Sequence, residues 1–279
     1  MRYVKYEVRE KTTVRKFLLG RGFSKRSTEE ILDNGYLLNN KLSKKSKDLR
    51  CGDKVNVIIE DENLDYEPID GRLNIIYEDS SSLVIAKEPG LTVNSKGQVS
   101  LANYIANYFK KEGIKSKVRF VNRLDMDTSG LILIAKNKFA HAYYQEQIEA
   151  NQMEKKYLAV VDTKVNYDFV FEKRFAYNKE SKSYKANKEG KVCKTIFKTV
   201  FTDETMSVIE CNILTGKTHQ IRASLSYLGH PIYGDKLYGS NINLDRFLLH
   251  SYYLSFKTFD SGENIILKDW PSFISFKEF

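Results

Sequence analysis

Residues 119–136 read Arg-Phe-Val-Asn-Arg-Leu-Asp-Met-Asp-Thr-Ser-Gly-Leu-Ile-Leu-Ile-Ala-Lys, and they decide how the rest of the chain is interpreted. Residues 131–135 form a continuous apolar run, which predicts a strand buried on both faces. Residues 122–130 are polar, charged and small, as in a loop. Asp125 would then sit just before a rigid support, which a group that must meet a substrate requires. The alternative is that Asp127 forms an Asx-type turn and Asp125 is solvated.

The composition is that of a globular chain without a membrane span. Hydrophobic residues make up 42% and charged residues 29% of the 279 positions, close to the averages for globular domains. No apolar run reaches the ~18–20 residues of a membrane helix, and the first residues lack the apolar core of a signal peptide. We therefore expect a cytoplasmic chain with one large domain and one small domain. The cysteines and histidines show no metal-ligand spacing, so neither a metal site nor a disulfide framework is expected.

Positive charge is concentrated at the start of the chain. Residues 1–59 hold 15 Lys and Arg against 7 Asp and Glu, whereas the rest of the chain is close to neutral. A basic module on a near-neutral domain is typical of a protein that binds a polyanion such as nucleic acid, although a basic surface can also be merely solvated. An acidic stretch with one Pro and one Gly follows, which predicts a linker. We expect a domain at 1–60, an acidic linker at 61–71 and a larger domain at 72–279.

Hydrophobic periodicity predicts helices and strands in alternation. In the first domain we expect two short helices, the second opened by Ser27 in capping-box spacing with Glu30, and then small strands. In the larger domain, strands are expected at 74–79, 82–87, 131–135, 154–161, 193–201 and 205–214, and helices at 100–112, at 138–150 and after Thr218. Residues 177–191 are rich in Lys and Ser and predict a mobile hairpin or loop.

Several blocks of the chain resemble those of one enzyme family. Residues 122–131, Asn-Arg-Leu-Asp-Met-Asp-Thr-Ser-Gly-Leu, resemble the HRLD-x-x-TSGL signature of the RluA-type RNA pseudouridine synthases. The chain departs from the family at Asn122, where His is usual, and at Lys217, where Arg is usual and a bidentate fork is lost. Further similar blocks occur in the family's order, one before this stretch at 73–93 and four after it at 155–161, 215–222, 229–239 and 248–256. The first module resembles an S4 RNA-binding domain.

The resemblance implies an α+β pseudouridine synthase fold, with a mixed, largely antiparallel sheet flanked by helices and a small N-terminal S4-like αβ domain. It implies that Asp125 is the catalytic carboxylate, that Arg222 keeps it ionised, and that Tyr157 lies against the uracil. Asp125 could attack C1′ of the ribose or act as a base at C2′, and the sequence leaves both routes open. No cofactor and no metal are expected, because the isomerisation neither oxidises the substrate nor removes a group.

RNA contacts are expected from two groups of residues. In the larger domain these are Arg123, which would fill the space left by the extruded base, and Lys217, His219 and Gln220. In the S4-like domain they are Arg15, Lys16, Arg21, Lys25 and Arg26. The predicted substrate is ribosomal RNA, above all 23S, with transfer RNA as the alternative, and the chain is expected to be a monomer that does not contact membranes. Two other classes of function remain open: a non-catalytic RNA-binding or ribosome-assembly factor, and an N-glycoside hydrolase that releases the base.

Overall fold

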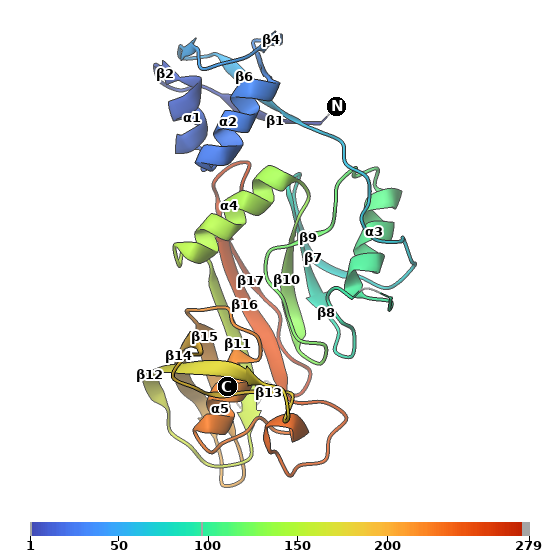
Figure 1. Cartoon of the computed structure of the whole chain (residues 1–279), viewed down its shortest axis with the longest axis vertical. Helices are drawn as coiled ribbons and strands as arrows, with labels where there is room; N and C mark the ends of the chain where they lie inside the picture. Colours follow the sequence, from blue (N-terminus) through green and yellow to red (C-terminus); the bar gives the residue numbers. More distant parts are fainter. Residues whose placement is uncertain (1, 96, 275–279) are drawn as a thin grey trace.

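The computed structural model describes residues 2–95 and 97–274, which form a large sheet flanked by helices and a smaller αβ module (Figure 1). The sheet has 11 strands in the order β13-β12-β14-β15-β11-β16-β10-β8-β7, with β9 beside β10 and β17 beside β16. Among the described residues, β10 and β16 form its one parallel pair. The expected α+β fold with a largely antiparallel sheet is confirmed. The strands are β7 (Asn74–Glu78), β8 (Ser82–Lys87), β9 (Arg119–Phe120), β10 (Ser129–Ala135), β11 (Glu154–Val161), β12 (Asp168–Asn178), β13 (Ser183–Ala186), β14 (Lys191–Thr202), β15 (Ser207–Ile213), β16 (Leu249–Lys257) and β17 (Asn264–Lys268), and the helices are α3 (Leu101–Lys111), α4 (Lys138–Glu149), α5 (Gln220–Tyr227) and the short 3-10 helix η1 (Lys236–Tyr238).

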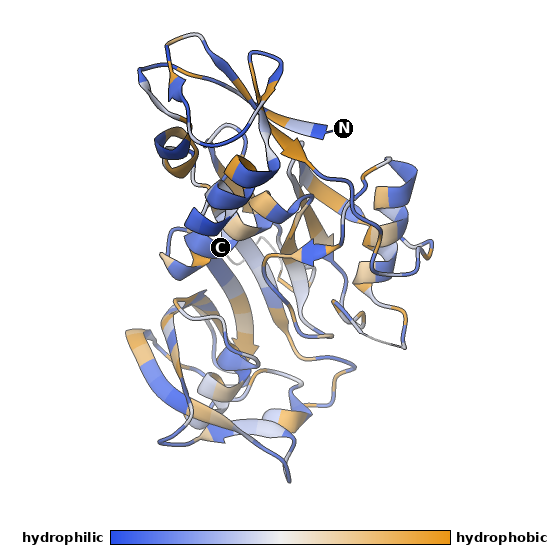
Figure 2. Ribbon diagram, turned by 45° about the horizontal axis from the view of Figure 1, so that its top comes forward, coloured by the Kyte–Doolittle hydropathy of each residue, from blue (hydrophilic) through white to orange (hydrophobic). Residues whose placement is uncertain are grey.

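Strand β10 is buried on both faces, as its continuous apolar run predicts. Successive side chains of a strand point to opposite faces, so Ile132 and Ile134 join the core on one side. Leu131 and Leu133 join the core on the other. Helix α3 covers the first side and helix α4 the second, and in Figure 1 the two helices lie on either side of β10. Figure 2 shows that these helices mix hydrophobic and hydrophilic residues, as expected for elements buried on one side only.

The junction between the loop and β10 requires a glycine. Gly130 has φ +107°, and a Cβ at this position would lie 2.3 Å from the carbonyl oxygen of Ser251 on β16. Only glycine combines this left-handed backbone with so close an approach. The start of the strand is therefore fixed against β16, and it holds the end of the loop that carries Asp125 in a defined position.

The N-terminal module is a four-stranded sheet in the order β1-β6-β3-β4, covered by two helices. Ser24, rather than the expected Ser27, caps the second helix, because its side chain accepts a hydrogen bond from the backbone N–H of Ser27. The side chain of Glu30 is used elsewhere and accepts from Lys138 at 2.5 Å. The elements are β1 (Arg2–Glu7), β2 (Thr12–Thr13), α1 (Val14–Gly20), α2 (Lys25–Asn34), β3 (Tyr36–Leu38), β4 (Lys41–Ser43), β5 (Asp48–Leu49) and β6 (Lys54–Ile59).

This module is docked on the larger body. The ring of Phe23 lies 5.7 Å from that of Phe139 on α4 and 5.1 Å from that of Phe259, between centroids. Next to this apolar contact, the ammonium of Lys138 also pairs with Glu60 at 2.8 Å. One cluster of buried side chains therefore runs from the module into the body.

The acidic stretch after β6 follows α3 closely. Asp65 accepts a hydrogen bond from the backbone N–H of Val118 at 2.9 Å, and Asp70 pairs with Lys111 at 2.8 Å. Leu64 and Tyr66 pack against the core. These contacts hold the stretch in place along the body. Helices long and apolar enough to cross a membrane do not occur in the described ranges.

Candidate active site

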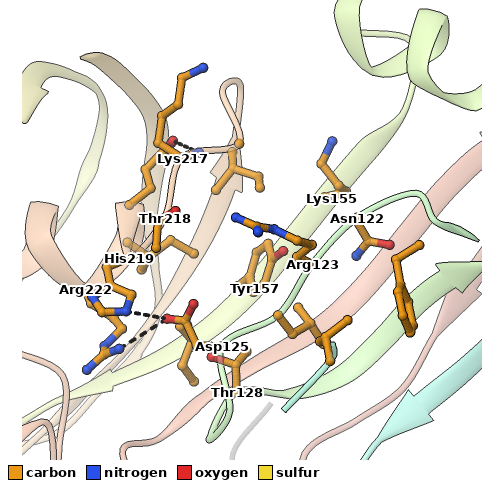
Figure 3. Close-up of a pocket in the computed structure, with 18 of the residues that line it drawn as sticks. Asn122, Arg123, Asp125, Thr128, Lys155, Tyr157, Lys217, Thr218, His219 and Arg222 are labelled. Carbon is orange, nitrogen blue, oxygen red and sulfur yellow. Dashed lines mark hydrogen bonds and ion pairs between the residues drawn. The ribbon is translucent and has the colours of Figure 1, made fainter. Parts of the chain in front are cut away.

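A cleft of about 570 Å³ opens between the loop before β10, strand β11 and the loop that leads into α5. Its volume falls within the usual range for a small-molecule site. Figure 3 shows its labelled side chains converging from these three segments. Asp125, Tyr157 and Arg222, far apart in the sequence, all line it. Within residues 2–95 and 97–274, no three His, Cys, Asp or Glu side chains gather as metal ligands would.

Asp125 is the carboxylate at the floor of this cleft. Arg222 donates from Nη1 to Oδ2 of Asp125 at 3.2 Å, and Nε2 of His219 lies 3.8 Å from the same oxygen. The backbone carbonyl of Asp125 accepts from the N–H of Thr128 at 3.2 Å and so closes the turn. About a quarter of the side chain, 26%, remains exposed. The carboxylate is therefore ion-paired and oriented, yet it keeps an open side for a reacting atom.

Arg222 is itself held by a second carboxylate, Asp235. Its Nε and Nη2 donate to the two oxygens of Asp235 at 2.7 and 2.9 Å, a bidentate pair in which Asp235 is only 1% exposed. The ring of Phe247 lies 4.2 Å and that of Tyr238 5.0 Å from the guanidinium carbon. Burial opposes the charge of Arg222, but the ion pairs with Asp235 and Asp125 outweigh burial and raise its pKa. Arg222 is thus a fixed cation that bridges two carboxylates.

Tyr157 lies on β11 with its side chain toward the cleft and 6% exposed. Burial raises the pKa of its phenol, the nearby charge of Asp125 adds to this, and a hydrogen bond with Ser251 partly offsets it. The hydroxyl therefore stays protonated at neutral pH. In the free chain it is a hydrogen-bond donor and an apolar surface rather than a ready base.

The loop before α5 carries the other residues expected at the site. Lys217 is exposed at the cleft edge. His219, not the expected Thr218, is the N-cap of α5, with φ 53°, and its Nδ1 is 3.0 Å from the hydroxyl of Tyr238. Burial lowers the pKa of His219, against the opposing charge of Asp125. The side-chain amide of Gln220 makes its hydrogen bonds within the protein. Its Nε2 donates to the carbonyl of Lys194 and to Thr195, and its Oε1 accepts from Thr215 and from the N–H of Lys217.

Arg123 and Asn122 precede Asp125 on the loop. Arg123 is exposed, and in Figure 3 its guanidinium extends into the cleft near Tyr157. Asn122 is buried, and its Oδ1 accepts from the backbone N–H of Leu133 on β10 at 2.8 Å. The residue that departs from the family signature therefore braces the loop against the strand.

The basic residues expected in the N-terminal module lie outside the cleft lining. Arg15, Lys16, Lys25 and Arg26 are exposed, and Arg15 pairs with Glu29. Arg21 is partly buried, with its guanidinium carbon 5.3 Å from the centroid of the Tyr6 ring. Lys16, Lys25 and Arg26 are therefore accessible to a large polyanion, whereas Arg15 is held by its ion pair.

Sequence reasoning missed three charged groups around the site: Asp235, Lys87 and Lys155. The ammonium of Lys87 donates to three carbonyls, those of Glu88 at 2.8 Å, Leu91 at 2.9 Å and Met126 at 2.7 Å. It therefore fastens the residue after Asp125 to the turn that follows β8. Burial lowers the pKa of Lys87 to about 8. The sequence offered one signal for Asp235, Lys87 and Lys155, namely that they lie within the family-like blocks at 229–239, 73–93 and 155–161. Their contacts form only in the folded chain.

Outside the cleft, a Ser, a His and an Asp are linked in the order seen in serine hydrolases, but the serine hydroxyl is not accessible. Oγ of Ser129 lies 2.8 Å from Nδ1 of His250, whose Nε2 is 3.3 Å from Asp269. Ser129 is 6% exposed and lies outside the cleft lining, so no substrate reaches its hydroxyl. The chain of contacts ties the start of β10 to β16 instead.

Comparisons with known proteins agree on one family. The sequence profile of RNA pseudouridylate synthases matches residues 81–227. An uncharacterised RNA pseudouridine synthase of Bacillus subtilis, YhcT, is 36% identical over 77% of this chain and 72% of its own length. Ribosomal large subunit pseudouridine synthase C of Buchnera aphidicola is 31% identical over 69% of this chain and 65% of its own. The structure of human RNA pseudouridylate synthase domain containing 1 shares the fold, with TM-score 0.62 and 23% identity over 73% of this chain and 85% of that one.

Proposed function

Because the chain belongs to the RNA pseudouridylate synthase family and is an isomerase that converts uridine in RNA to pseudouridine, we propose that Asp125 is its catalytic carboxylate and that ribosomal RNA is its substrate. The proposed role of Asp125 rests on the arrangement of charged side chains in the cleft. In it a partly open carboxylate is paired with an arginine that a second, buried carboxylate holds in place. We assign the chain to the RluA-type branch on its residues at 122–131.

The reaction breaks the N1–C1′ bond of a uridine, turns the base and joins C5 to C1′. Asp125 acts at the ribose, either as a nucleophile at C1′ or as a base at C2′, and both routes need an ionised carboxylate at a fixed place. Arg222 holds the Asp125 carboxylate in place by its ion pair and its hydrogen bond of 3.2 Å. Because Asp235 holds the guanidinium from the other side, Arg222 orients Asp125 without a large loss of freedom in each turnover.

The remaining groups of the cleft handle the base. The target uridine must leave its helix to reach Asp125, and Arg123 extends where it can stack in the vacated space. Tyr157 contacts the uracil from the β11 side. Since burial keeps its phenol protonated, it either donates a hydrogen bond to the turned base or loses its proton only once the substrate has changed its surroundings. The C5 proton leaves in the last step.

The N-terminal module is proposed to be an S4-like RNA-binding domain at 1–60, followed by the linker at 61–71 and the catalytic domain at 72–279. Its exposed cations, Lys16, Lys25 and Arg26, can meet phosphates without reading sequence. The Buchnera relative is a ribosomal large subunit pseudouridine synthase, which supports large-subunit ribosomal RNA, hence 23S, as the substrate class, with transfer RNA as the second candidate. We further propose a monomer that works in the cytoplasm.

The experiment is a pseudouridine map of total RNA from cells with and without the gene, with rescue by plasmid. Wild type should restore a few discrete sites in ribosomal RNA, and Asp125→Asn should restore none. Asp127→Asn is the matched control, because it removes a carboxylate from the same loop two residues away, and it should rescue. Rescue by Asp125→Asn would remove the proposed nucleophile or base, and lost sites confined to transfer RNA would move the substrate to the second candidate.

Two further outcomes address the other classes of function. Release of free uracil from RNA would indicate an N-glycoside hydrolase, whereas tritium release from RNA labelled at uridine C5 without free uracil indicates isomerisation. If the chain binds RNA but releases neither uracil nor tritium, a non-catalytic RNA-binding factor would be the remaining class of function.

A further inference from the structure

Lys155 lies on the cleft wall, and its amine has no partner among the residues that the structure describes. Its side chain is 7% exposed and lines the same cleft as Asp125. Over the described ranges 2–95 and 97–274, no carbonyl, hydroxyl or carboxylate pairs with its ammonium, and burial alone lowers its pKa to about 8. Among the described residues, Nζ of Lys155 is not one of the fully enclosed polar atoms that lack a partner, so the ammonium faces the open cleft although most of the residue is buried. A group outside the folded chain is therefore the expected partner.

The strand geometry of β11 says where this ammonium points. Lys155 and Tyr157 are two residues apart on one strand, so their side chains lie on the same face, about 6.6 Å apart along it. Lys156 lies on the opposite face, where its ammonium is 3.8 Å from Glu210 and 5.1 Å from the ring centroid of Tyr253. In the view of Figure 3, Tyr157 lies between Asp125 and Lys155. The cation is thus placed on the side of Tyr157 away from the reacting carboxylate.

We propose that Lys155 binds a non-bridging phosphate oxygen of the RNA strand next to the uridine in the cleft. This inference rests on the proposed function, in which the ribose meets Asp125 and the base meets Tyr157. Uracil and ribose are neutral, and the phosphodiester is the anionic group of the substrate. An ammonium beyond Tyr157 therefore matches the backbone where the strand leaves the cleft. The contact is a charge-assisted hydrogen bond, and it supplies the partner that the free chain lacks.

The test uses the full chain and a fluorescent oligouridylate, whose binding is measured at several salt concentrations. Lys155→Met should weaken binding about tenfold at low salt and reduce the slope of log Kd against log salt by about 0.7, the value for one phosphate contact on a single strand. Lys155→Arg should retain most of the affinity. Lys156→Met is the matched control, since it removes the same charge one residue away on the other face, and both affinity and slope should be unchanged.

A merely structural lysine would behave differently. Because the ammonium is unpaired in the free chain, Lys155→Met should raise the melting temperature of the free protein while it weakens RNA binding. A lower melting temperature that Lys155→Arg does not restore would overturn the inference. An unchanged salt slope would place Lys155 on the base, and oligouridylate that fails to bind wild type would also refute the phosphate site. Tritium release by the wild-type chain reports the proposed function separately.

Discussion

Two isosteric substitutions on either side of Arg222 should separate stability from catalysis. Asp235→Asn removes the buried carboxylate that holds Arg222 by hydrogen bonds of 2.7 and 2.9 Å. Asp125→Asn removes the partly exposed one at 3.2 Å. Both changes delete one negative charge beside the same guanidinium and keep the shape of the side chain. We expect the first to damage folding and the second to abolish chemistry.

The magnitudes follow from burial. Asp235 is 1% exposed and Arg222 6%, and removing one partner of such a buried pair costs about 3–5 kcal/mol of stability. For a domain of this size that lowers the melting temperature by roughly 6–20 °C. Asp125 is 26% exposed, so its loss should cost about 0–1 kcal/mol. Arg222 without Asp235 keeps one weaker partner and can shift by a fraction of an ångström, which can reduce kcat by about 10²-fold.

Thermal unfolding followed by circular dichroism measures the first effect, and tritium release from uridine-labelled RNA measures kcat and KM. Asp235→Asn should lose kcat with little change in KM, because its carboxylate does not line the cleft. Equal stabilities for the two variants would refute the reasoning, since the bidentate pair would then not be what holds Arg222. A rise in KM at constant kcat would place Asp235 in RNA binding instead.

Three further outcomes test other parts of the structure. Tyr157→Phe should keep RNA affinity in a filter-binding assay and slow tritium release by about 10²–10⁴-fold, and a full rate would exclude the hydroxyl from the reaction. Burial lowers the pKa of Lys155 from its ordinary 10.5 to about 8, so between these pH values the unfolded chain binds more protons than the folded chain and the free energy of unfolding rises with pH. In urea unfolding, wild type should therefore gain about 1–2 kcal/mol more stability than Lys155→Met from about pH 8 to about pH 9.5. Equal gains for the two proteins would contradict this. Lys25→Glu combined with Arg26→Glu should weaken RNA binding and flatten its salt dependence without changing the single-turnover rate, whereas unchanged binding would remove the module from RNA contact.

Local patterns predicted the elements that position the site. The apolar run at 131–135 became the core of β10, and the amphipathic stretches at 100–112 and 138–150 became α3 and α4, each within two residues at either end. Such elements are predictable because burial repeats with the period of the backbone itself. The stretch at 177–191 was predicted as a mobile hairpin or loop, and a hairpin is present in it: the end of β12 turns into β13 at 183–186, and the two strands pair antiparallel. Because β13 is an edge strand, its polar, Lys-rich sequence is compatible with a sheet.

The contacts that orient the loop carrying Asp125 could not be predicted in this way. Lys87 reaches the carbonyl of Met126 across 39 positions, and Asp235 reaches Arg222 across 13. Neither pairing has a periodicity, because both depend on how separate strands and turns meet in the fold. The predicted capping box of the second helix was wrong for a related reason. Glu30 has capping-box spacing from Ser27, but its carboxylate pairs with Lys138 across the junction with the larger body.

The docking of the N-terminal module changes how its role should be tested. A basic module joined by a flexible linker could be deleted without consequence for the larger body. Here, however, Phe23 covers Phe139 and Phe259, and Lys138 is paired with carboxylates of the module. Removal of the module would expose this apolar surface and take away both ion-pair partners of Lys138, so a truncated chain would report impaired folding as much as lost RNA binding. Charge reversal at its exposed cations leaves the junction intact, and it therefore isolates the electrostatic contribution that the sequence assigned to this module.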